Sequence, residues 1–327
     1  MKTKTIVLGV CSGMALLPSI LNAQIVYSDN FNSGAGDAVN WNINSGPGNN
    51  SATFGFDYST VGIPSAPNSG DGSTIGLKLN ANNLVTGQLL TGISVSPISL
   101  SVSGDYQLRF DMWANFIGPA PGGGSGSTQI TGAGIGTSGT AANYAGAANG
   151  IWFAGTGDGN SASDYRVYTP AVPSSLGAGN PVYAAPGGAI NNSATAYYTS
   201  FYPAHTAPAA QTTLFPSQTG SVAAGAMGWA WHDVTITKIG NSLAWNMDGQ
   251  LFASLDITTN GVLSGNDFMF VQSDINTTAS SDANGTTLNF GLFDNVVVTQ
   301  IPEPISCALG ILGGFGLFLA RRRTHKV

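Results

Sequence analysis

Acid–base chemistry in the central part of this 327-residue chain depends on aspartate. The only Glu of the sequence is Glu303, whereas residues 24–300 contain 15 Asp. Two aspartates that face one cleft could hydrolyse a glycosidic bond with inversion, one as the acid and one as the base. The candidates for such a glycan-active hydrolase are Asp105, Asp111 and Asp233.

Histidine and cysteine offer little further chemistry in the same part of the chain. His205 and His232 are its only histidines, and both cysteines, Cys11 and Cys307, lie near the ends of the sequence. No Gly-x-Ser-x-Gly segment accompanies the histidines, and a zinc site needs more nitrogen or sulfur ligands. We therefore expect no catalytic residue of these types, no disulfide in residues 24–300, and a structural role for His232.

Aromatic and polar side chains near residues 106–113 and 229–231 could instead bind a carbohydrate. Sugar rings pack their C–H faces on aromatic rings, while carboxylates and amides bond the hydroxyl groups. In an alternating strand, Leu108, Phe110 and Met112 would face the core and the residues between them the other side. The candidates are Arg109, Asp111, Trp113, Trp229 and Trp231 on an open sheet, with Tyr197, Tyr198 and Tyr202 as a loop platform. For each tryptophan, packing in the core is the alternative.

The charge distribution argues against nucleic acid as a partner. The whole chain has a net charge of −6, but residues 24–300 keep four basic residues against 15 Asp, a net charge of −11. Such a surface repels nucleic acid and anionic membranes. It could attract Ca²⁺, which prefers oxygen ligands.

The first 23 residues have the pattern of a secretory signal peptide. Lys2 and Lys4 precede an apolar run over residues 6–21, and the small residue Ala23 follows it. This pattern predicts transport by the secretion machinery and cleavage by signal peptidase between Ala23 and Gln24. An uncleaved membrane anchor is the alternative.

Residues 301–327 form a tail of three parts. The motif Pro302, Glu303 and Pro304 precedes the uncharged stretch Ile305–Ala320, and the tail ends in a basic cluster. As a helix, this stretch would be about 24 Å long, just short of the thickness of a bilayer core. We therefore expect a single transmembrane helix in the inner membrane, with its basic end cytoplasmic. The basic residues next to the helix are Arg321, Arg322 and Arg323.

This order of motif, helix and basic cluster resembles the PEP-CTERM sorting signal of Gram-negative bacteria. The resemblance implies that a membrane-embedded exosortase recognises Pro302-Glu303-Pro304 and cleaves near it. It also implies an inner-membrane precursor and a mature protein at the cell surface, in the outer envelope or in the extracellular matrix. A plain tail anchor is the alternative.

Residues 24–300 are expected to form an all-β domain. Stretches rich in β-branched and aromatic residues alternate with Gly, Asn, Asp, Ser and Pro clusters, which is typical of strands and turns. Asp248-Gly249 predicts a two-residue hairpin, and the segments 118–150 and 169–225 are predicted as long loops. The predicted strands are Ser51–Phe56, Thr74–Leu79, Tyr106–Trp113, Gly150–Phe153, Tyr165–Tyr168, Trp229–Lys238, Leu243–Met247, Leu251–Leu255, Asp267–Val271 and Leu288–Thr299.

The predicted hairpin resembles the central hairpin of laminin-G-like and concanavalin A-like jelly rolls. Trp231-His232 opens its first strand and Asp248-Gly249 follows its second, and Asn289–Val298 resembles the closing strand of those families. The resemblance implies a single jelly-roll β-sandwich. It implies no cofactor other than a structural Ca²⁺ at Asp29 and Asp294, where the first and last strands would meet. The Glu pair of the glycosidases with this fold is absent from residues 24–300.

Together these patterns predict an exported, non-catalytic protein of the cell surface or extracellular matrix. Its sandwich would bind glycan in the exopolysaccharide of a biofilm or serve as a structural component there. Two alternatives are a secreted glycan-active hydrolase that uses aspartate and a structural matrix protein that associates with itself.

Overall fold

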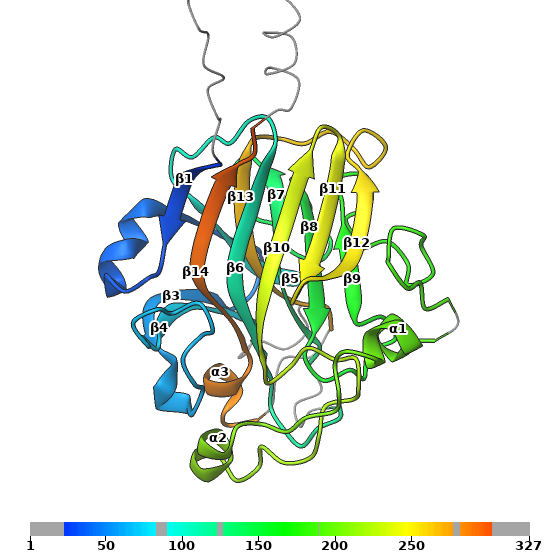
Figure 1. Cartoon of the computed structure of the whole chain (residues 1–327). Coiled ribbons are helices and arrows are strands. Elements are labelled where there is room, and N and C mark those ends of the chain that lie inside the picture. The colour runs from blue at the N-terminus through cyan, green and yellow to red at the C-terminus, as the bar shows by residue number, and fades with distance from the viewer. Residues whose placement is uncertain (1–22, 83–89, 123–126, 189, 277–281, 303–327) are drawn as a thin grey trace, which may run out of the picture. The chain divides into compact units, whose positions relative to one another are not determined.

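A computed structural model of the chain describes residues 23–82, 90–122, 127–188, 190–276 and 282–302, and Gln24–Ile301 form one compact unit. Two antiparallel sheets face each other in this unit, which confirms the all-β sandwich (Figure 1). The signal-peptide residues 1–22 and the tail residues 303–327 lie outside the described part. Within that part, no helix is long and apolar enough to cross a membrane.

The eight-stranded sheet has β6 and β14 at its centre. Its order is β12 (Gln250–Asp256), β11 (Ser242–Met247), β10 (Trp231–Ile239), β6 (Tyr106–Asn115), β14 (Phe290–Gln300), β4 (Ile75–Ala81) and β3 (Asn50–Asp57), and β1 (Gln24–Asp29) also pairs with β14. The predicted pairing of the first and last strands is therefore confirmed. The Asp248-Gly249 hairpin is confirmed as well, because Met247 pairs with Gln250 and both turn residues have positive φ angles, as a type I′ turn requires.

The six-stranded sheet covers the inner face of the first one. Its order is β2 (Trp41–Ser45), β5 (Thr91–Pro97), β13 (Asp267–Asp274), β7 (Gln129–Thr137), β8 (Ile151–Thr156) and β9 (Tyr165–Tyr168). Leu108, Phe110 and Met112 of β6 point into the core, as their alternation predicts. The Phe270 ring of β13 lies between Phe110 and Phe293, with centroid distances of 5.0 and 4.4 Å. Each such ring contributes about 1.5–3 kcal/mol by burial.

The prediction that residues 118–150 form one long loop is wrong, because β7 lies within them. The strand was missed because glycine is normally depleted in strands. Here the glycines allow close packing: a Cβ on Gly134 would lie 2.2 Å from the Ile151 carbonyl oxygen and 2.4 Å from the Trp152 Cβ. Strands β2 and β5 are two further strands that the sequence pattern did not predict.

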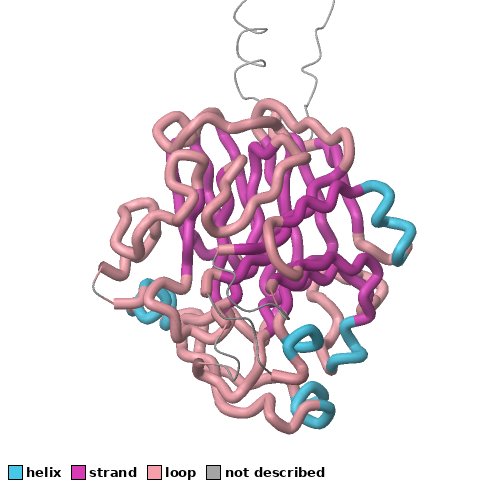
Figure 2. The backbone as a smooth tube through the Cα atoms, turned by 180° about the vertical axis from the view of Figure 1, so that it is seen from behind, coloured by secondary structure: helices cyan, strands magenta, loops and turns pink. Residues whose placement is uncertain are grey.

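The chain itself covers the outer face of the six-stranded sheet. Trp152 of β8 and Tyr168 of β9 stack there with ring centroids 3.9 Å apart, and both are fully buried. Ala145, in the segment between β7 and β8, belongs to the same apolar cluster. Figure 2 shows loops crossing in front of these strands. The stacked rings on this face are therefore buried beneath other parts of the chain.

The segment predicted as a loop over 169–225 contains short helices and closes one edge of the sandwich. These helices are η3 (Asn192–Ala194), α1 (Ala196–Thr199) and α2 (Ala209–Leu214). Tyr198 and Tyr202 enter the core against Phe252 of β12, and the Tyr198 hydroxyl donates to the Phe252 carbonyl over 3.1 Å. The remaining short helices are η1 (Gly34–Asn40), η2 (Tyr58–Val61) and α3 (Gly285–Leu288).

We predict that Gly134→Ala destabilises the protein by about 1–3 kcal/mol, because the new methyl group overpacks the β7–β8 contact. The matched control is Gly36→Ala, where the added Cβ would meet nothing within 4 Å. Its effect should stay within about 0.5 kcal/mol. Denaturant unfolding of both variants measures the difference, and equal stabilities would contradict the packing of β7 against β8.

Candidate functional site

Three aspartates form a row across neighbouring strands on the outer face of the eight-stranded sheet. Asp111 of β6 pairs in register with Asp233 of β10 on one side and with Asp294 of β14 on the other. From the sequence, Asp111 and Asp233 were candidates for a hydrolase, and Asp294 was a calcium ligand that the resemblance implies. Asp105 is not part of this row; it accepts a hydrogen bond from the Gly240 amide at the end of β10.

The segment between η2 and β4 seals Asp111 from solvent. The backbone and side-chain amides of Asn68 donate to the two Asp111 oxygens over 3.1 and 2.6 Å. The Asn295 side chain donates a third hydrogen bond of 2.8 Å. Asp111 is 0% exposed. Its burial raises the pKa of this carboxyl, although the hydrogen bonds from Asn295 and Asn68 oppose the shift.

Asp294 is sealed in the same way by other donors. The hydroxyl groups of Tyr58 and Ser69 donate to its Oδ2 over 3.0 and 3.3 Å. Burial raises the pKa of Asp294 to about 7, and the negative charge of Asp111 adds to this shift. The carboxyl is therefore largely protonated below neutral pH.

Asp233 is the accessible member of the row, and it is held by an arginine. Arg109 Nε and Nη2 donate to the two Asp233 oxygens over 2.7 and 2.8 Å. Arg109 Nη2 also donates to the Asn68 side-chain oxygen over 3.0 Å, which ties the covering segment to the sheet. No second carboxylate of the row reaches solvent beside Asp233, so the arrangement does not form a paired acid and base.

The tryptophans expected on an open sheet belong to one apolar cluster, which includes Ile63 of the covering segment. Trp113 and Trp229 are buried, and Trp229 stacks on Phe116 with ring centroids 4.4 Å apart. Trp231 is partly buried and donates its indole N–H to the Pro64 carbonyl over 2.7 Å. The face expected to be open is therefore covered in part by the segment after η2, which binds the Trp231 indole through Pro64 and the Asp111 carboxylate through Asn68.

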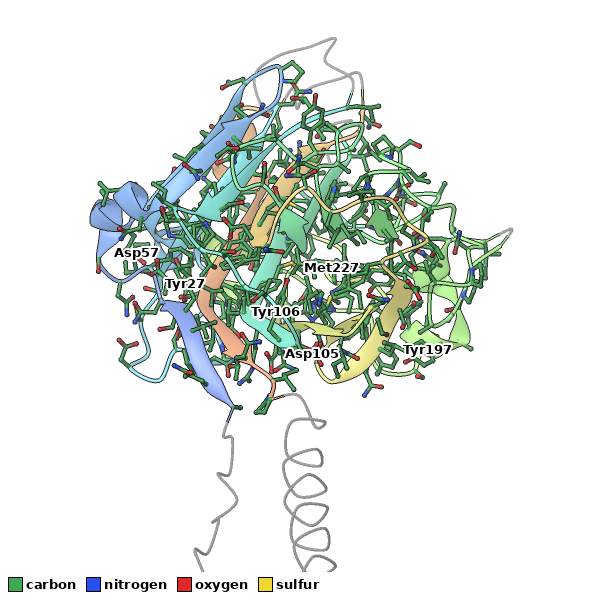
Figure 3. The ribbon with its side chains drawn as sticks, turned by 90° about the horizontal axis from the view of Figure 1, so that it is seen from above. Tyr27, Asp57, Asp105, Tyr106, Tyr197 and Met227 are labelled. Carbon is green, nitrogen blue, oxygen red and sulfur yellow. The ribbon has the colours of Figure 1, made fainter. Side chains whose placement is uncertain are left out.

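The tyrosines expected to form a loop platform contribute to the core and to the sheet edge. Tyr198 is fully buried and Tyr202 is 8% exposed. Tyr197 is 36% exposed, and its hydroxyl donates to the Leu251 carbonyl over 3.0 Å. Figure 3 shows Tyr197 and Tyr27 on opposite sides of the sandwich.

His232, expected to be a structural residue, is held through both of its ring nitrogens. Its Nδ1 lies 2.7 Å from Asp248 Oδ2 and its Nε2 lies 2.8 Å from the Met227 carbonyl oxygen. The Tyr202 hydroxyl donates to the same Asp248 oxygen over 2.8 Å. Burial raises the pKa of Asp248, but the hydrogen bond and charge of His232 outweigh it and hold the pKa below its usual value. These contacts join the hairpin turn to β10.

An open polar groove lies beside the sealed row, and we call it the β1–β14 groove. It has a volume of about 680 Å³. Arg109, predicted as a glycan-binding residue, and Asp29, predicted as a calcium ligand, both line it. Its other lining residues are Ser28, Asn30, Ser33, Asp37, Asn40, Asn68, Asn295, Val296 and Val297.

Sequence reasoning missed the asparagines of this groove and Asp37. A signal existed in the neighbouring pairs Asp29-Asn30 and Asp294-Asn295, which place an amide next to a carboxylate at the end of β1 and in the middle of its partner strand β14. The contribution of Asn68 could not be read in this way, because it lies 43 residues from Asp111 in the sequence.

The two predicted calcium ligands have separate partners in the structure. Asp29 accepts hydrogen bonds from the Phe31 amide and the Trp41 indole over 2.8 and 3.1 Å, whereas Asp294 lies beneath Tyr58 and Ser69. In the described residues, no group of three or more His, Cys, Asp or Glu side chains could hold a metal ion. A calcium ion shared by these two carboxylates stays a prediction.

Comparison with known proteins gives only distant structural similarities. No protein-family model and no curated protein matches the sequence. A laminarinase catalytic domain from Thermotoga maritima MSB8 aligns with 86% of this chain and 100% of its own, at 11% identity and a TM-score of 0.41. An endo-1,3-β-glucanase from Streptomyces sioyaensis aligns with 86% of this chain and 97% of its own, at 12% identity and a TM-score of 0.43. The carbohydrate recognition domain of Emp47p aligns with 81% and 89%, at 9% identity and a TM-score of 0.35.

We predict that ionisation of Asp294 makes the protein less stable as pH rises. The folded-state pKa of about 7 lies above the ordinary value of 3.8, so between these values the folded protein keeps a proton that the unfolded chain has lost. The stabilisation that this raised pKa gives the folded state is fully present below the pKa of Asp294 in the unfolded chain. It is lost as pH rises through the folded-state pKa of about 7. Asp294→Asn should therefore flatten the fall in Tm between pH 5 and 8.

The control for this prediction is Asp256→Asn, at a fully exposed site. Asp267, whose pKa is also raised to about 7 by burial, should leave part of the slope in place. An Asp294→Asn profile parallel to that of the unchanged protein would contradict the prediction.

Proposed function

We propose that this chain is an exported, non-catalytic glycan-binding protein of the cell surface or extracellular matrix. The observation that carries the proposal is the β1–β14 groove, which is open, polar and lined by amides, carboxylates and one guanidinium group. Amides both donate and accept hydrogen bonds, whereas the carboxylates accept and Arg109 donates. This set of groups matches the hydroxyl pattern of a polysaccharide.

The geometry of the aspartate row supports the non-catalytic part of the proposal. A general acid or base must come within hydrogen-bonding reach of its substrate. Asp111 is sealed by three hydrogen bonds, and Asp233 is held by Arg109. The runner-up, a hydrolase that uses aspartate, requires the covering segment to leave Asp111.

The sequence motifs support the proposed route of this protein to the cell surface. The signal peptide would deliver residues 24–300 across the inner membrane, and the tail would hold them there until an exosortase cleaves near Pro302-Glu303-Pro304. The mature sandwich would then lie in the outer envelope or the extracellular polysaccharide. Its resemblance to laminin-G-like and concanavalin A-like jelly rolls over 231–249 and 289–298 fits a binding role there.

We predict that Asn40→Ala weakens glycan binding by about five- to ten-fold, because one hydrogen bond contributes about 1 kcal/mol. Asn40 is exposed and lines the groove. The measurement is a glycan array and an exopolysaccharide pull-down with the full chain. The matched control is Asn241→Ala, an exposed turn asparagine outside the groove, which should bind like the unchanged protein.

Other outcomes of the same experiment favour the alternatives. Absence of glycan binding together with concentration-dependent association would favour the structural matrix protein. Release of reducing ends that Asp111→Asn or Asp233→Asn abolishes would favour the hydrolase.

For sorting, we predict that Glu303→Ala leaves an uncleaved, membrane-bound form. Glu303 is the only glutamate of the chain and the central residue of the motif. Its replacement by alanine therefore removes the charged group at the centre of the motif. Immunoblotting of membrane and surface fractions measures the two forms, with Asn40→Ala as a control that leaves the tail intact. Normal surface release of Glu303→Ala would overturn the exosortase route.

A further inference from the structure

Strand β2 is the outermost strand of the six-stranded sheet, and among the described residues one of its edges has no neighbouring strand. At one end of β2 the Ile98 amide donates to the Asn40 carbonyl over 2.7 Å. At the other end the Gly46 amide donates to the Gly92 carbonyl over 2.8 Å. Backbone groups of an antiparallel strand alternate between its two sides, so the even-numbered residues of β2 bond β5. The amide and carbonyl of Ile43 therefore lie at the free edge, where no hydrogen bond of the described part reaches them.

The chain covers other edges of the two sheets with its own segments. At the opposite edge of the six-stranded sheet, the Leu176 amide donates to the Val167 carbonyl of β9 over 2.8 Å. At the β12 edge of the eight-stranded sheet, the Ser254 amide donates to the Val182 carbonyl over 2.8 Å. Such cover keeps an edge from pairing with another chain. The outward backbone groups of β2 are left available for pairing.

Strand β2 also lacks the other features that keep an edge strand from pairing. Natural edge strands are protected by charged side chains, prolines or β-bulges. The sequence of β2 contains no charge and no proline, and its register with β5 is continuous over Trp41–Ser45. The Ile43 side chain is 50% exposed, and Val39 of η1 and Ile98 after β5 are exposed as well. An apolar margin therefore accompanies the free backbone groups.

We propose that the free edge of β2 binds the same edge of a second copy of this chain, in an antiparallel pair centred on Ile43. Ile43 of each copy would exchange both of its backbone hydrogen bonds with Ile43 of the other copy. Each Ser45 amide would donate to the Trp41 carbonyl of the other copy. The Trp41 amide takes no part, because it donates to the Ala38 carbonyl. The two six-stranded sheets would then form one continuous sheet.

The sequence of β2 favours a second copy over an unrelated partner. A two-fold contact requires a surface that is complementary to itself. Asn42-Ile43-Asn44 reads the same in both directions, so the pair would place Asn42 opposite Asn44 of the second copy. The two Ile43 side chains would meet at the centre. The Asn44 side chain donates to the Gly139 carbonyl over 3.0 Å, and its oxygen is the group that would accept from Asn42.

The charge of the protein points to the same edge. Residues 24–300 have a net charge of −11, so two copies repel each other over most orientations. An uncharged strand adds nothing to this repulsion. The pair is short, and small interfaces are weak, so we expect a dimer whose population depends on protein concentration. The inference goes beyond the proposed function, because this contact needs no glycan.

Sedimentation of the full chain in a nonionic detergent tests the proposal. We expect a monomer–dimer equilibrium that shifts toward the dimer with protein concentration, and further with NaCl, because salt screens the repulsion. Ile43→Lys would place like charges opposite each other and should weaken dimerisation about ten-fold or more. The matched control is Ser51→Lys, at an exposed position of β3, which is an edge strand of the eight-stranded sheet. It should dimerise like the unchanged protein.

A second variant separates lost pairing from lost folding. Ile43→Pro removes an amide that faces outward, and an edge strand tolerates proline at such a position. It should therefore keep the pairing of β2 with β5 and weaken dimerisation as Ile43→Lys does. Thermal unfolding checks that the substituted proteins remain folded.

Disulfide trapping tests the register of the pair. The Ile43 Cα atoms of the two copies would lie about 5.5 Å apart, within the range that a disulfide spans. In a chain that also carries Cys11→Ser and Cys307→Ser, Ile43→Cys should therefore form a cross-linked dimer on oxidation. Asn42→Cys should cross-link far less by itself, but readily when mixed with Asn44→Cys.

Three results would overturn the proposal. These are a monomer at every concentration, equal dimerisation of Ile43→Lys and the unchanged protein, and cross-linking of Asn42→Cys alone as efficient as that of Ile43→Cys. The second result would place any association at other residues of the chain. Glycan binding by a strict monomer would overturn this inference alone, whereas a dimer that binds no glycan would overturn the proposed function alone.

Discussion

The carboxylate of Asp111 is the constraint on which the outer face of the eight-stranded sheet depends. It lies on the central strand β6, fully buried, and no Lys, Arg or His binds it directly among the described residues. A buried carboxylate without donors would cost several kcal/mol. The three N–H donors of Asn68 and Asn295 offset this cost, so the segment that contains Asn68 must lie across the sheet.

The same requirement explains the irregularity of β14. Its pairing with β6 shifts register between Asp294 and Val297, and Asn295 has a φ of 50° there. A β-bulge of this kind bends a strand and redirects its side chains, and asparagine tolerates a positive φ better than most residues. The bulge lets Asp294 point under the covering segment while Asn295 reaches Asp111 and lines the groove. The same bulge therefore both helps to cover the sheet face and shapes the groove.

The parts of the fold that the sequence predicted are those set by local patterns. Alternation placed Leu108, Phe110 and Met112 in the core, and Asp248-Gly249 marked its hairpin because only a few residues adopt the required φ angles. The failures came from long-range contacts. Strand β7 needs its glycines only because β8 packs against them, and no pattern within β7 reveals this partner.

The site was predictable to the same limited extent. Arg109 and Asp111 were recognised as residues of a strand face and Asp294 as a calcium ligand that the resemblance implies, and the structure places all three in or beside one constellation. The burial of Trp113 was one of the two alternatives that the sequence left open, because its cluster partner Ile63 lies far away in the sequence. Asp37 gave no signal in sequence, since what marks it is a buried Oδ2 atom without a hydrogen-bond partner among the described residues, a property that only the packed structure has.

The chain's own loops cover both outer faces of the sandwich, and this determines which interactions a bound sugar could make. Among the described residues, the lining of the groove includes no aromatic side chain that could stack on a sugar. Binding there must rely on hydrogen bonds, which exchange against water and contribute little each. A single groove would then bind a sugar weakly, and retention in a matrix would come from many copies contacting one repeating polymer.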